Sequence, residues 1–247
     1  MSSQDYTRKE VLPLKWCPGC GLHILFSSLT QALDELDLKN TVVVSGIGCT
    51  GRGAGFFGLD SVHGMHGRAI PLAVGMKKAN PDLNVLVYSG DGDLLGIGGN
   101  HLLHAARRND NITVICNLNE VFAMTGRQTS PTTAKGVVTI TSPHGNEYEP
   151  INAQGIIASN KRFFFGRVSP MHRDHMKQVL KEAMEHKGFS FVEMRFPCVI
   201  EYSKSTGKGL AEAYKEGREA YTIADEKQLT DENRLLADNE LGIVKKG

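Results

Sequence analysis

The stretch Tyr88–Gln128, YSGDGDLLGIGGNHLLHAARRNDNITVICNLNEVFAMTGRQ, decides the fold that we expect for this chain. The apolar run Val85–Ser89 ends at a Gly-Asp-Gly turn and indicates a buried strand. We expect a helix over His101–Arg108 and a second apolar strand over Ile112–Leu118. A strand, a helix and a second strand in this order predict two parallel strands of an α/β sheet. Such sheets bind ligands at the carboxyl ends of their strands.

Asp91 and Asn119 follow these two strands, so the sheet would bring them together at its carboxyl edge. A carboxylate and an amide carbonyl beside the start of a helix are hard oxygen ligands that suit Mg²⁺ carrying a diphosphate. Gly-Asp-Gly with a downstream Asn is also the pattern of thiamine-diphosphate enzymes. An ordinary strand-to-helix turn is the alternative, but the strand–helix–strand context favours the magnesium site. We therefore predict a doubly wound, mostly parallel α/β sheet of the thiamine-diphosphate-binding type.

The composition is that of a charge-balanced chain. Its 247 residues can bury a large core, and 28 basic against 27 acidic side chains suggest no role on nucleic acid or at a membrane surface. No apolar run is long enough to span a bilayer and the first residues form no apolar segment, so we expect the cytoplasm. There the five cysteines are better interpreted as metal ligands, redox groups or core residues than as structural disulfides.

The segment Trp16–Gly21, WCPGCG, carries a Cys-x-x-Cys motif ahead of an expected helix. Apolar residues at helical spacing form one stripe of that helix: Leu22, Leu25, Leu29, Leu33 and Leu36. The motif has three interpretations: a redox dithiol, half of a zinc site, or half of an iron–sulfur site. A thioredoxin-like fold would need a strand just before the motif, and no clear strand precedes Trp16. The motif alone does not choose among them.

A second glycine motif, Gly46–Gly51, reads G-x-G-x-x-G behind the β-branched strand Thr41–Ser45. The letters match a dinucleotide-binding turn, but the GRGAGFFGLD that begins at the last glycine is rich in glycine and poor in helix formers. A dinucleotide site also needs a second strand ending in an acidic residue, and HGMHGR occupies that region instead. We therefore interpret the motif as a tight turn that presents Cys49 at the end of the strand.

His63 and His66 lie in a glycine-rich segment ahead of an expected helix at Arg68–Ala79, in whose first turn Pro71 is tolerated. The two histidines could be metal ligands, or they could merely shape a loop. No third ligand is in register with them. We favour His66 as a donor to the phosphates of a cofactor.

Beyond the central stretch, we expect strands at Arg162–Val168 and Phe189–Phe196 and a helix capped by Asp174 that runs to His186. From about Ser203 the chain is charged and punctuated by glycine. We expect that part to be a peripheral tail or an arm that contacts a partner.

Four of the five cysteines lie at a turn or a strand end beside Gly or Pro, where a thiolate can be presented: Cys17, Cys20, Cys49 and Cys198. The fifth, Cys116, lies inside the apolar strand VICNL and is most simply a core residue. Four thiolates could hold a tetrahedral zinc ion or a cubane iron–sulfur cluster. Their spacing alone does not choose between the two.

Taken together, the segments between Trp16 and Cys198 resemble the β, thiamine-diphosphate-binding, subunit of 2-oxoacid:ferredoxin oxidoreductases. The segments that carry the resemblance are WCPGCG, SGIGCTGR, HGMHGRAIPLAVGMKKANPDLNV, GDGD, GGNHLLHAARRN, NLNEVFAMTG, QTSPTT and the late Pro-Cys. The resemblance implies a [4Fe-4S] cluster held by the four turn cysteines. It also implies Mg²⁺ and thiamine diphosphate, with the metal bound by Asp91, Asn119 and the backbone carbonyl of Val121.

The resemblance also assigns the remaining site residues. The implied cofactor-binding residues are Gly48, Cys49, His66, Gly90, Asp91, Gly92, Asp93, Asn119, Val121 and Thr125. The implied catalytic residues are His66 and Arg52, which matches a basic position directed at substrate carboxylates in the family. Residues 1–202 would form the thiamine-diphosphate-binding domain with its cluster, and residues 203–247 the tail.

The activity implied by the resemblance is CoA-dependent oxidative decarboxylation of a 2-oxo acid, with electrons relayed through the cluster to ferredoxin. In this family the glutamate that activates thiamine diphosphate comes from the α subunit, so we expect the chain to be inactive alone. Further ferredoxin-like subunits are also expected partners. Two alternatives stay open: a non-oxidative decarboxylase or synthase with structural zinc, and a non-catalytic iron–sulfur carrier subunit.

The loop Phe122–Gln128 departs from the family pattern. It reads FAMTGRQ where family members usually read YGLTGGQ or YGLTKGQ, and Met124 stands where pyruvate-type members carry Asn. Arg127 adds a second cation besides Arg52 that could bind a second carboxylate or face a partner chain. These departures favour 2-oxoglutarate over pyruvate as the substrate.

Overall fold

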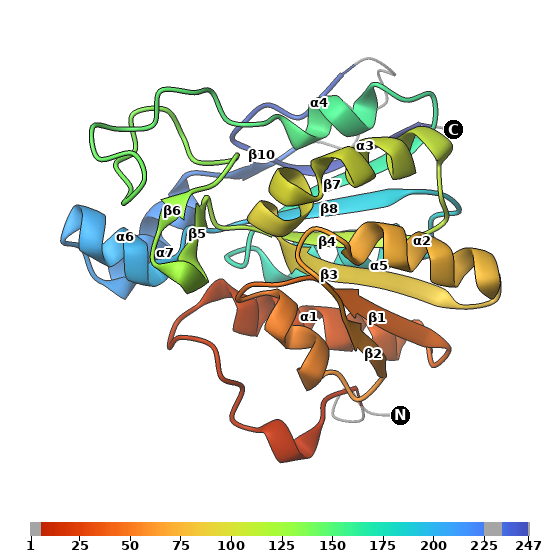
Figure 1. Ribbon diagram of the computed structural model, residues 1–247. Coiled ribbons are helices and arrows are strands. Elements are labelled where there is room, and N and C mark those ends of the chain that lie inside the picture. The colour runs from red at the N-terminus through yellow and green to blue at the C-terminus, as the bar shows by residue number, and fades with distance from the viewer. Residues whose placement is uncertain (1–5, 225–233, 247) are drawn as a thin grey trace.

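Parallel strands dominate the computed structural model, which describes residues 6–224 and 234–246 (Figure 1). Eight described strands form one sheet in the order β2-β1-β3-β4-β8-β7-β10-β9. All neighbours run parallel except β10, which is antiparallel to β7. The strands are β1 (Thr41–Ser45), β2 (Asp60–His63), β3 (Asn84–Gly90), β4 (Thr113–Leu118), β7 (Phe163–Val168), β8 (Ser190–Arg195), β9 (Thr222–Ile223) and β10 (Glu240–Lys246). A separate hairpin joins β5 (Val121–Phe122) to β6 (Gln128–Thr129).

Helices cover both faces of the sheet (Figure 1). The α-helices are α1 (Gly21–Glu35), α2 (Ala69–Ala79), α3 (Gly99–Arg108), α4 (Ala153–Ala158), α5 (Arg173–Glu185), α6 (Val199–Thr206) and α7 (Leu210–Glu219). Short 3₁₀ turns lie at η1 (Lys9–Val11), η2 (Gly51–Phe56) and η4 (Ala123–Thr125), and a π-helical segment η3 at Gly92–Ile97. The predicted doubly wound α/β fold is confirmed.

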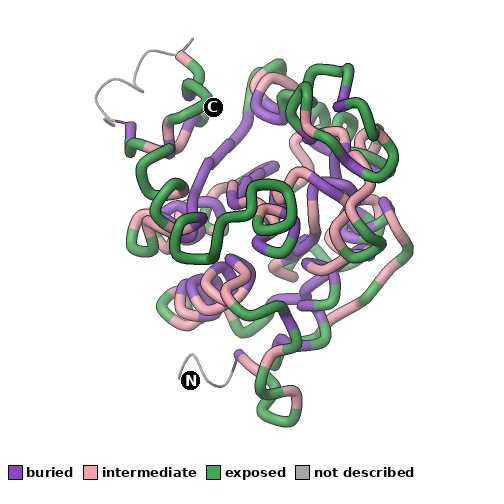
Figure 2. Tube along the Cα trace, turned by 90° about the vertical axis from the view of Figure 1, so that its left-hand side faces the viewer, coloured by how far each residue is buried: buried purple, intermediate pink, exposed green. Residues whose placement is uncertain are grey.

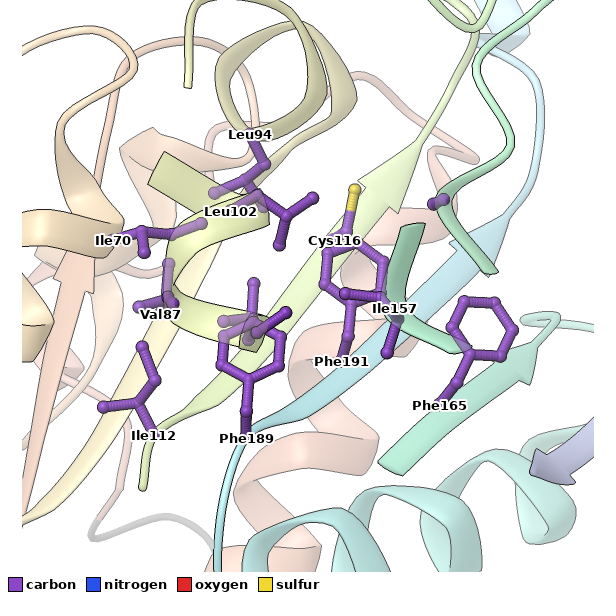
Figure 3. Packing of buried hydrophobic residues seen from close by; sticks show 14 of the residues in the cluster. Ile70, Val87, Leu94, Leu102, Ile112, Cys116, Ile157, Phe165, Phe189 and Phe191 are labelled. Carbon is purple, nitrogen blue, oxygen red and sulfur yellow. The ribbon is translucent and has the colours of Figure 1, made fainter. Parts of the chain in front are cut away.

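Each central strand is buried on both faces because its successive side chains enter opposite cores. In β1, Val42 and Val44 face the core beneath α2, α3 and α4, whereas Val43 faces the core beneath α1 and α5. Figure 3 shows the first core, in which Cys116 of β4 lies with Ile157 of α4. Figure 2 shows buried residues along the strands and exposed residues on the outer turns and loops. The near-continuous apolar runs in the sequence follow from this two-sided burial.

Most predicted elements occur within a residue or two of their expected bounds. The predicted helix cap at Asp174 is wrong: α5 begins at Arg173, after His172, and Asp174 lies in its first turn. A carboxylate there still favours the helix because it faces the positive end of the dipole. The strand β2 and the π-helical segment η3 were not predicted, because β2 is short and half-exposed and η3 is rich in glycine.

The C-terminal part is more than a peripheral tail. The predicted boundary between residues 202 and 203 falls inside α6, and β10 pairs with β7 from Gly242 opposite Arg167 to Lys246 opposite Phe163. The prediction of a tail is therefore wrong for residues 240–246, which complete the sheet. Residues 1–5, 225–233 and 247 of the two predicted domains lie outside the described part of the chain. None of the described helices combines the length and apolar character needed to cross a membrane.

His175 on α5 makes the stability of this fold depend on pH. Burial lowers the pKa of His175, neighbouring His172 lowers it further, and Glu182 opposes them. The folded protein thus binds a proton at His175 less readily than the unfolded chain does. The contribution of His175 to the free energy of unfolding is therefore complete above the unfolded pKa of about 6.5, and it decreases as the pH drops below that value.

We expect His175→Gln to reduce this acid-side loss of stability. The measurement is the free energy of unfolding by guanidinium chloride between pH 7.5 and 5, and His104→Gln, at an exposed position of α3, is the matched control. Equal pH slopes for the two variants would contradict the assignment to His175.

Candidate active site and cysteine pocket

One pocket at the carboxyl ends of β1, β3 and β4 contains every residue predicted to bind the cofactor. Its lining includes Gly48, Cys49, His66, Gly90, Asp91, Gly92, Asp93, Asn119, Val121 and Thr125. From β1 the chain continues to β2 on one side of the sheet, and from β3 it continues to β4 on the opposite side. The pocket therefore lies at the point where the strand order reverses, the switch point of the sheet. We call it the cofactor pocket. Open α/β sheets bind their ligands at this location.

Asp91 is held at the end of β3 by donors from two later loops. The residue is only 2% exposed, and its Oδ2 accepts hydrogen bonds from the Glu120 amide (3.1 Å), the Ser130 hydroxyl (3.2 Å) and the Thr132 hydroxyl. Burial raises the pKa of Asp91, while these hydrogen bonds act in the opposite direction. A cation in the pocket would favour the ionised carboxylate. Ser130 and Thr132 belong to the QTSPTT segment, and their role was not predicted.

The loop after β4 supplies the other predicted metal ligands. Asn119 lines the pocket, and its Oδ1 accepts a hydrogen bond from the Val121 amide (3.4 Å). Glu120 between them has φ of 68°, which turns the chain sharply after the strand. Opposite this loop, Gly48 has φ of 116°, and a Cβ built on it would meet nothing within 4 Å. Carboxylate, amide and carbonyl oxygens facing bare backbone fit a hard cation and its diphosphate.

Asp93 holds together the turns that line the cofactor pocket. Its Oδ1 accepts hydrogen bonds from the amides of Gly67 (2.7 Å) and Ile47 (3.2 Å) and lies 2.6 Å from His66 Nδ1. Its Oδ2 accepts one from the Ser89 hydroxyl (2.9 Å). Both carboxylate oxygens are thus engaged by the protein, so Asp93 acts on a ligand through His66. The side chain of His66 is 33% exposed and lines the pocket.

The glycines of the G-x-G-x-x-G motif make a tight turn. A Cβ at Gly46 would lie 2.0 Å from Asp93 Oδ2, and one at Gly51 would lie 2.2 Å from the Gly46 carbonyl. No larger residue fits either position without moving the turn. The other predicted loop histidine, His63, is paired through Nδ1 with the Ser45 hydroxyl (2.8 Å) on the neighbouring strand and does not line the cofactor pocket.

The four turn cysteines line a second pocket, which we call the cysteine pocket: Cys17, Cys20, Cys49 and Cys198. All five cysteines are free thiols, and Cys116 is buried in β4 away from this pocket. Burial raises the pKa of Cys20 to about 11 and also raises those of Cys49 and Cys198, and the thiols reinforce one another. Within residues 6–224 and 234–246, no three His, Cys, Asp or Glu side chains are grouped as a single metal ion requires. The four turn cysteines instead line one shared pocket.

The two pockets adjoin. Cys49, Asn119 and Ala123 line both of them, so these residues form a common wall. Trp16 fixes one side of this wall because its indole N–H donates to the Cys49 carbonyl (2.7 Å). Its ring packs edge-on against Phe56, with ring centroids 4.9 Å apart. No role was predicted for Trp16, although its position directly before Cys17 of the Cys-x-x-Cys motif was a signal for one.

The two predicted anion-binding arginines differ in their surroundings. Arg52 is exposed at the cysteine pocket, and its guanidinium donates to the Lys15 carbonyl (3.4 Å). Arg127 lies 3.4 Å from the carboxylate of Glu201, a residue that is 8% exposed on α6. The charge of Arg127 is thus engaged within the chain. Arg52 is the better placed of the two for a substrate carboxylate.

Comparison with known proteins agrees with this geometry. Residues 46–194 match the thiamine pyrophosphate enzyme family, C-terminal TPP binding domain, and this segment contains the cofactor pocket. The chain is 42% identical over 195 residues to the 2-oxoglutarate synthase subunit KorB of Archaeoglobus fulgidus, covering 78% of this chain and 73% of that protein. It is 43% identical over 187 residues to the 2-oxoacid:ferredoxin oxidoreductase subunit beta of Saccharolobus solfataricus, covering 74% and 61%.

A solved structure shares the whole fold. It is the 2-oxoglutarate:ferredoxin oxidoreductase from Magnetococcus marinus with 2-oxoglutarate, coenzyme A and succinyl-CoA bound. The likeness has a TM-score of 0.85 at 28% identity and covers 100% of this chain and 85% of that chain. Fold and pocket thus define a thiamine pyrophosphate enzyme. Within that class, the chain belongs to the β subunits of 2-oxoacid:ferredoxin oxidoreductases, and the predicted family and oxidoreductase class are confirmed.

Proposed function

We propose that this chain binds Mg²⁺ and thiamine diphosphate in the cofactor pocket and a [4Fe-4S] cluster in the cysteine pocket. As the β subunit, it would carry out CoA-dependent oxidative decarboxylation of a 2-oxo acid to acyl-CoA and CO₂. The observation that carries the proposal is the common wall of Cys49, Asn119 and Ala123. Cys49, a proposed ligand of the cluster, and Asn119, a proposed ligand of the magnesium ion, both belong to this wall, and electron transfer would require the two cofactors to lie this close.

The residues of the cofactor pocket would share the work of binding. Asp91, Asn119 and the Val121 carbonyl would hold the metal, and His66, oriented by Asp93, would donate to the diphosphate. The remaining contacts would come from a strip of small residues, Gly48, Gly90, Gly92 and Thr125. When bound, thiamine diphosphate supplies the chemistry by which a 2-oxo acid loses CO₂, and an iron–sulfur cluster supplies one-electron chemistry.

The favoured substrate is 2-oxoglutarate. The Archaeoglobus relative is named a 2-oxoglutarate synthase subunit, and the solved structure holds 2-oxoglutarate with coenzyme A. In this chain, Arg52 would face the substrate carboxylates from the mouth of the cysteine pocket. Met124, at the edge of the cofactor pocket, would take the place of the Asn that pyruvate-type members carry.

The proposal includes partners and a compartment. The α subunit would supply the glutamate that activates thiamine diphosphate, and ferredoxin, with further ferredoxin-like subunits, would take the electrons. The naming of the relatives as subunits supports the first of these. We place the assembly in the cytoplasm.

We expect the chain co-purified anaerobically with its α subunit to reduce ferredoxin when given 2-oxoglutarate and CoA, and the chain alone to give no turnover. The measurement is CoA-dependent ferredoxin reduction across a series of 2-oxo acids, with a reaction lacking CoA as control. No reduction with any of them would overturn the proposal. Bound zinc in place of iron would favour the non-oxidative alternative. A cluster without thiamine diphosphate binding would favour the carrier subunit.

A further inference from the structure

The helices α6 and α7 form a hairpin that begins directly after Cys198. They lie together beyond the sheet, near β5 and β6 (Figure 1). The sequence offers no chemical role for them, and the proposed cluster site uses only Cys198 at their start. Their contacts nevertheless reach the other end of the cysteine set.

The helix α7 rests on the turn between Cys17 and Cys20. The phenol of Tyr214 donates a hydrogen bond to the Gly19 carbonyl (2.9 Å). Gly19 has φ of 73°, and a Cβ built on it would lie 2.2 Å from a methyl carbon of Leu210. The turn itself closes when the Cys20 amide donates to the Cys17 carbonyl (3.0 Å). The left-handed backbone favours glycine here, and the side chain of Leu210 packs where a Cβ would lie.

The ring of Tyr214 contacts the segment that carries the fourth cysteine. It packs edge-on against Phe196, with ring centroids 5.1 Å apart, and Phe196 lies two residues before Cys198. One side chain therefore bridges two segments that are remote in sequence. Its hydroxyl touches the turn of Cys17 and Cys20, and its ring touches the approach to Cys198.

Separate contacts join the two helices of the hairpin. The carboxylate of Glu216 on α7 accepts hydrogen bonds from Tyr202 of α6 and from Lys208 in the connecting turn. Ala213, the residue before Tyr214, is 2% exposed, so this side of α7 faces the protein. A bridge of this kind has a defined position, which a ligand-orienting contact needs.

We propose that Tyr214 is a positioning residue of the cysteine pocket, fixing the Cys17–Cys20 turn and the Cys198 segment relative to each other. The inference rests on the proposed cluster site and adds a residue that orients its ligands. It also gives residues 199–219 a role within their own chain. Outer contacts that orient metal ligands typically change metal retention on the order of 10-fold or more when removed.

Tyr214→Phe tests the hydrogen bond, because it removes the phenolic oxygen and keeps the ring on Phe196. Tyr202→Phe is the matched control: its hydroxyl bonds to Glu216 inside the same hairpin and not to the cysteine turn. Leu210→Ala is a second variant, which loosens the contact with Gly19. All are prepared anaerobically as the complex with the α subunit.

The measurement is the rate at which the absorbance at about 400 nm, typical of thiolate-bound clusters, is lost in excess bathophenanthroline disulfonate. We expect Tyr214→Phe to lose it on the order of 10-fold faster than wild type, Leu210→Ala also faster, and Tyr202→Phe at the wild-type rate. The electron paramagnetic resonance spectrum of the reduced cluster should change in Tyr214→Phe alone of the two phenylalanine variants. A general loss of stability would not produce that change.

The outcomes distinguish the cluster site itself from the role of Tyr214 beside it. A wild-type complex that holds no such chromophore would overturn the cluster proposal and this inference with it. A wild-type complex with the chromophore, but with equal loss rates and spectra for Tyr214→Phe and Tyr202→Phe, would overturn the role of Tyr214 alone.

Discussion

Replacing Asp91 by alanine is expected to weaken Mg²⁺-dependent binding of thiamine diphosphate by about 100-fold or more. The reason is that Asp91 is the one carboxylate in the cofactor pocket offered as a direct metal ligand, and Asp93 has both oxygens engaged by protein donors. Loss of even an outer contact to a metal ligand typically costs about 10- to 100-fold in affinity. The measurement is isothermal titration of the α/β complex with thiamine diphosphate at saturating Mg²⁺.

Thr132→Val gives a graded version of the same test. It keeps the shape of the side chain but removes the hydroxyl that bonds to Asp91 Oδ2. We expect a loss of affinity of about 10-fold or more. Thr141→Val is the matched control, since its hydroxyl bonds to Thr129 in the same loop and not to Asp91. Wild-type affinity in Asp91→Ala would place the metal elsewhere, and equal affinities in the two threonine variants would remove Thr132 from the site.

Replacing Arg167 by methionine is expected to destabilise the folded chain by about 3–5 kcal/mol. Arg167 and Glu193 face each other across β7 and β8 at 2.5 Å, and their side chains are 2% and 1% exposed. Removing Arg167 leaves the buried carboxylate of Glu193 without its closest partner and with Arg195 (2.8 Å) as the remaining cation beside it. Arg167 also donates to the carbonyls of Ala237 (2.6 Å) and Glu240 (3.4 Å), which anchors the start of β10.

The second carboxylate oxygen of Glu193 makes the expected loss larger, because it is buried and has no hydrogen-bond partner among the described residues. The double variant Arg167→Met with Glu193→Leu should recover part of the loss, since no buried carboxylate remains, although Arg195 loses its ion pair with Glu193. Lys135→Met is the surface control: Lys135 and Glu149 form an exposed pair, and its removal should leave stability unchanged. Guanidinium chloride unfolding measures all three, and a small effect of Arg167→Met, equal to that of Lys135→Met, would contradict the prediction.

The sequence predicted the centre of the fold well because the signals there are local. The strand before Asp91 and the strand before Asn119 are mostly apolar, since both of their faces are buried. The intervening helix α3 has its own apolar stripe. Once both strands are placed in one parallel sheet, the meeting of Asp91 and Asn119 at its edge follows from topology alone.

The strand β10 could not be predicted in the same way. Its sequence, ELGIVKK, mixes charged and apolar residues, and its place in the sheet depends on pairing with Phe163–Val168, which is remote in sequence. The segment becomes a strand because it pairs with a segment that is distant in the sequence. Such pairing leaves no periodic pattern in either segment. The charged character of the surrounding stretch therefore indicated a tail.

The same limit applies to the site. Asp93 follows the GDG motif so closely that it looks like a cofactor ligand, yet its partners come from the turns at Ile47 and Gly67. Arg127 looked available for a substrate, and its partner Glu201 lies on a helix beyond the last cysteine. Whether a polar side chain already has a hydrogen-bond or ion-pair partner depends on contacts between distant segments. A sequence motif contains only one of the two partners.

The common wall of Cys49, Asn119 and Ala123 has a thermodynamic consequence. These residues line both pockets, so a ligand that fixes them in one pocket also fixes part of the lining of the other. If filling one pocket changes the affinity of the second by some factor, filling the second must change the first by the same factor, because binding free energies around a closed cycle sum to zero. The coupling between the two pockets is therefore the same whichever of them is filled first.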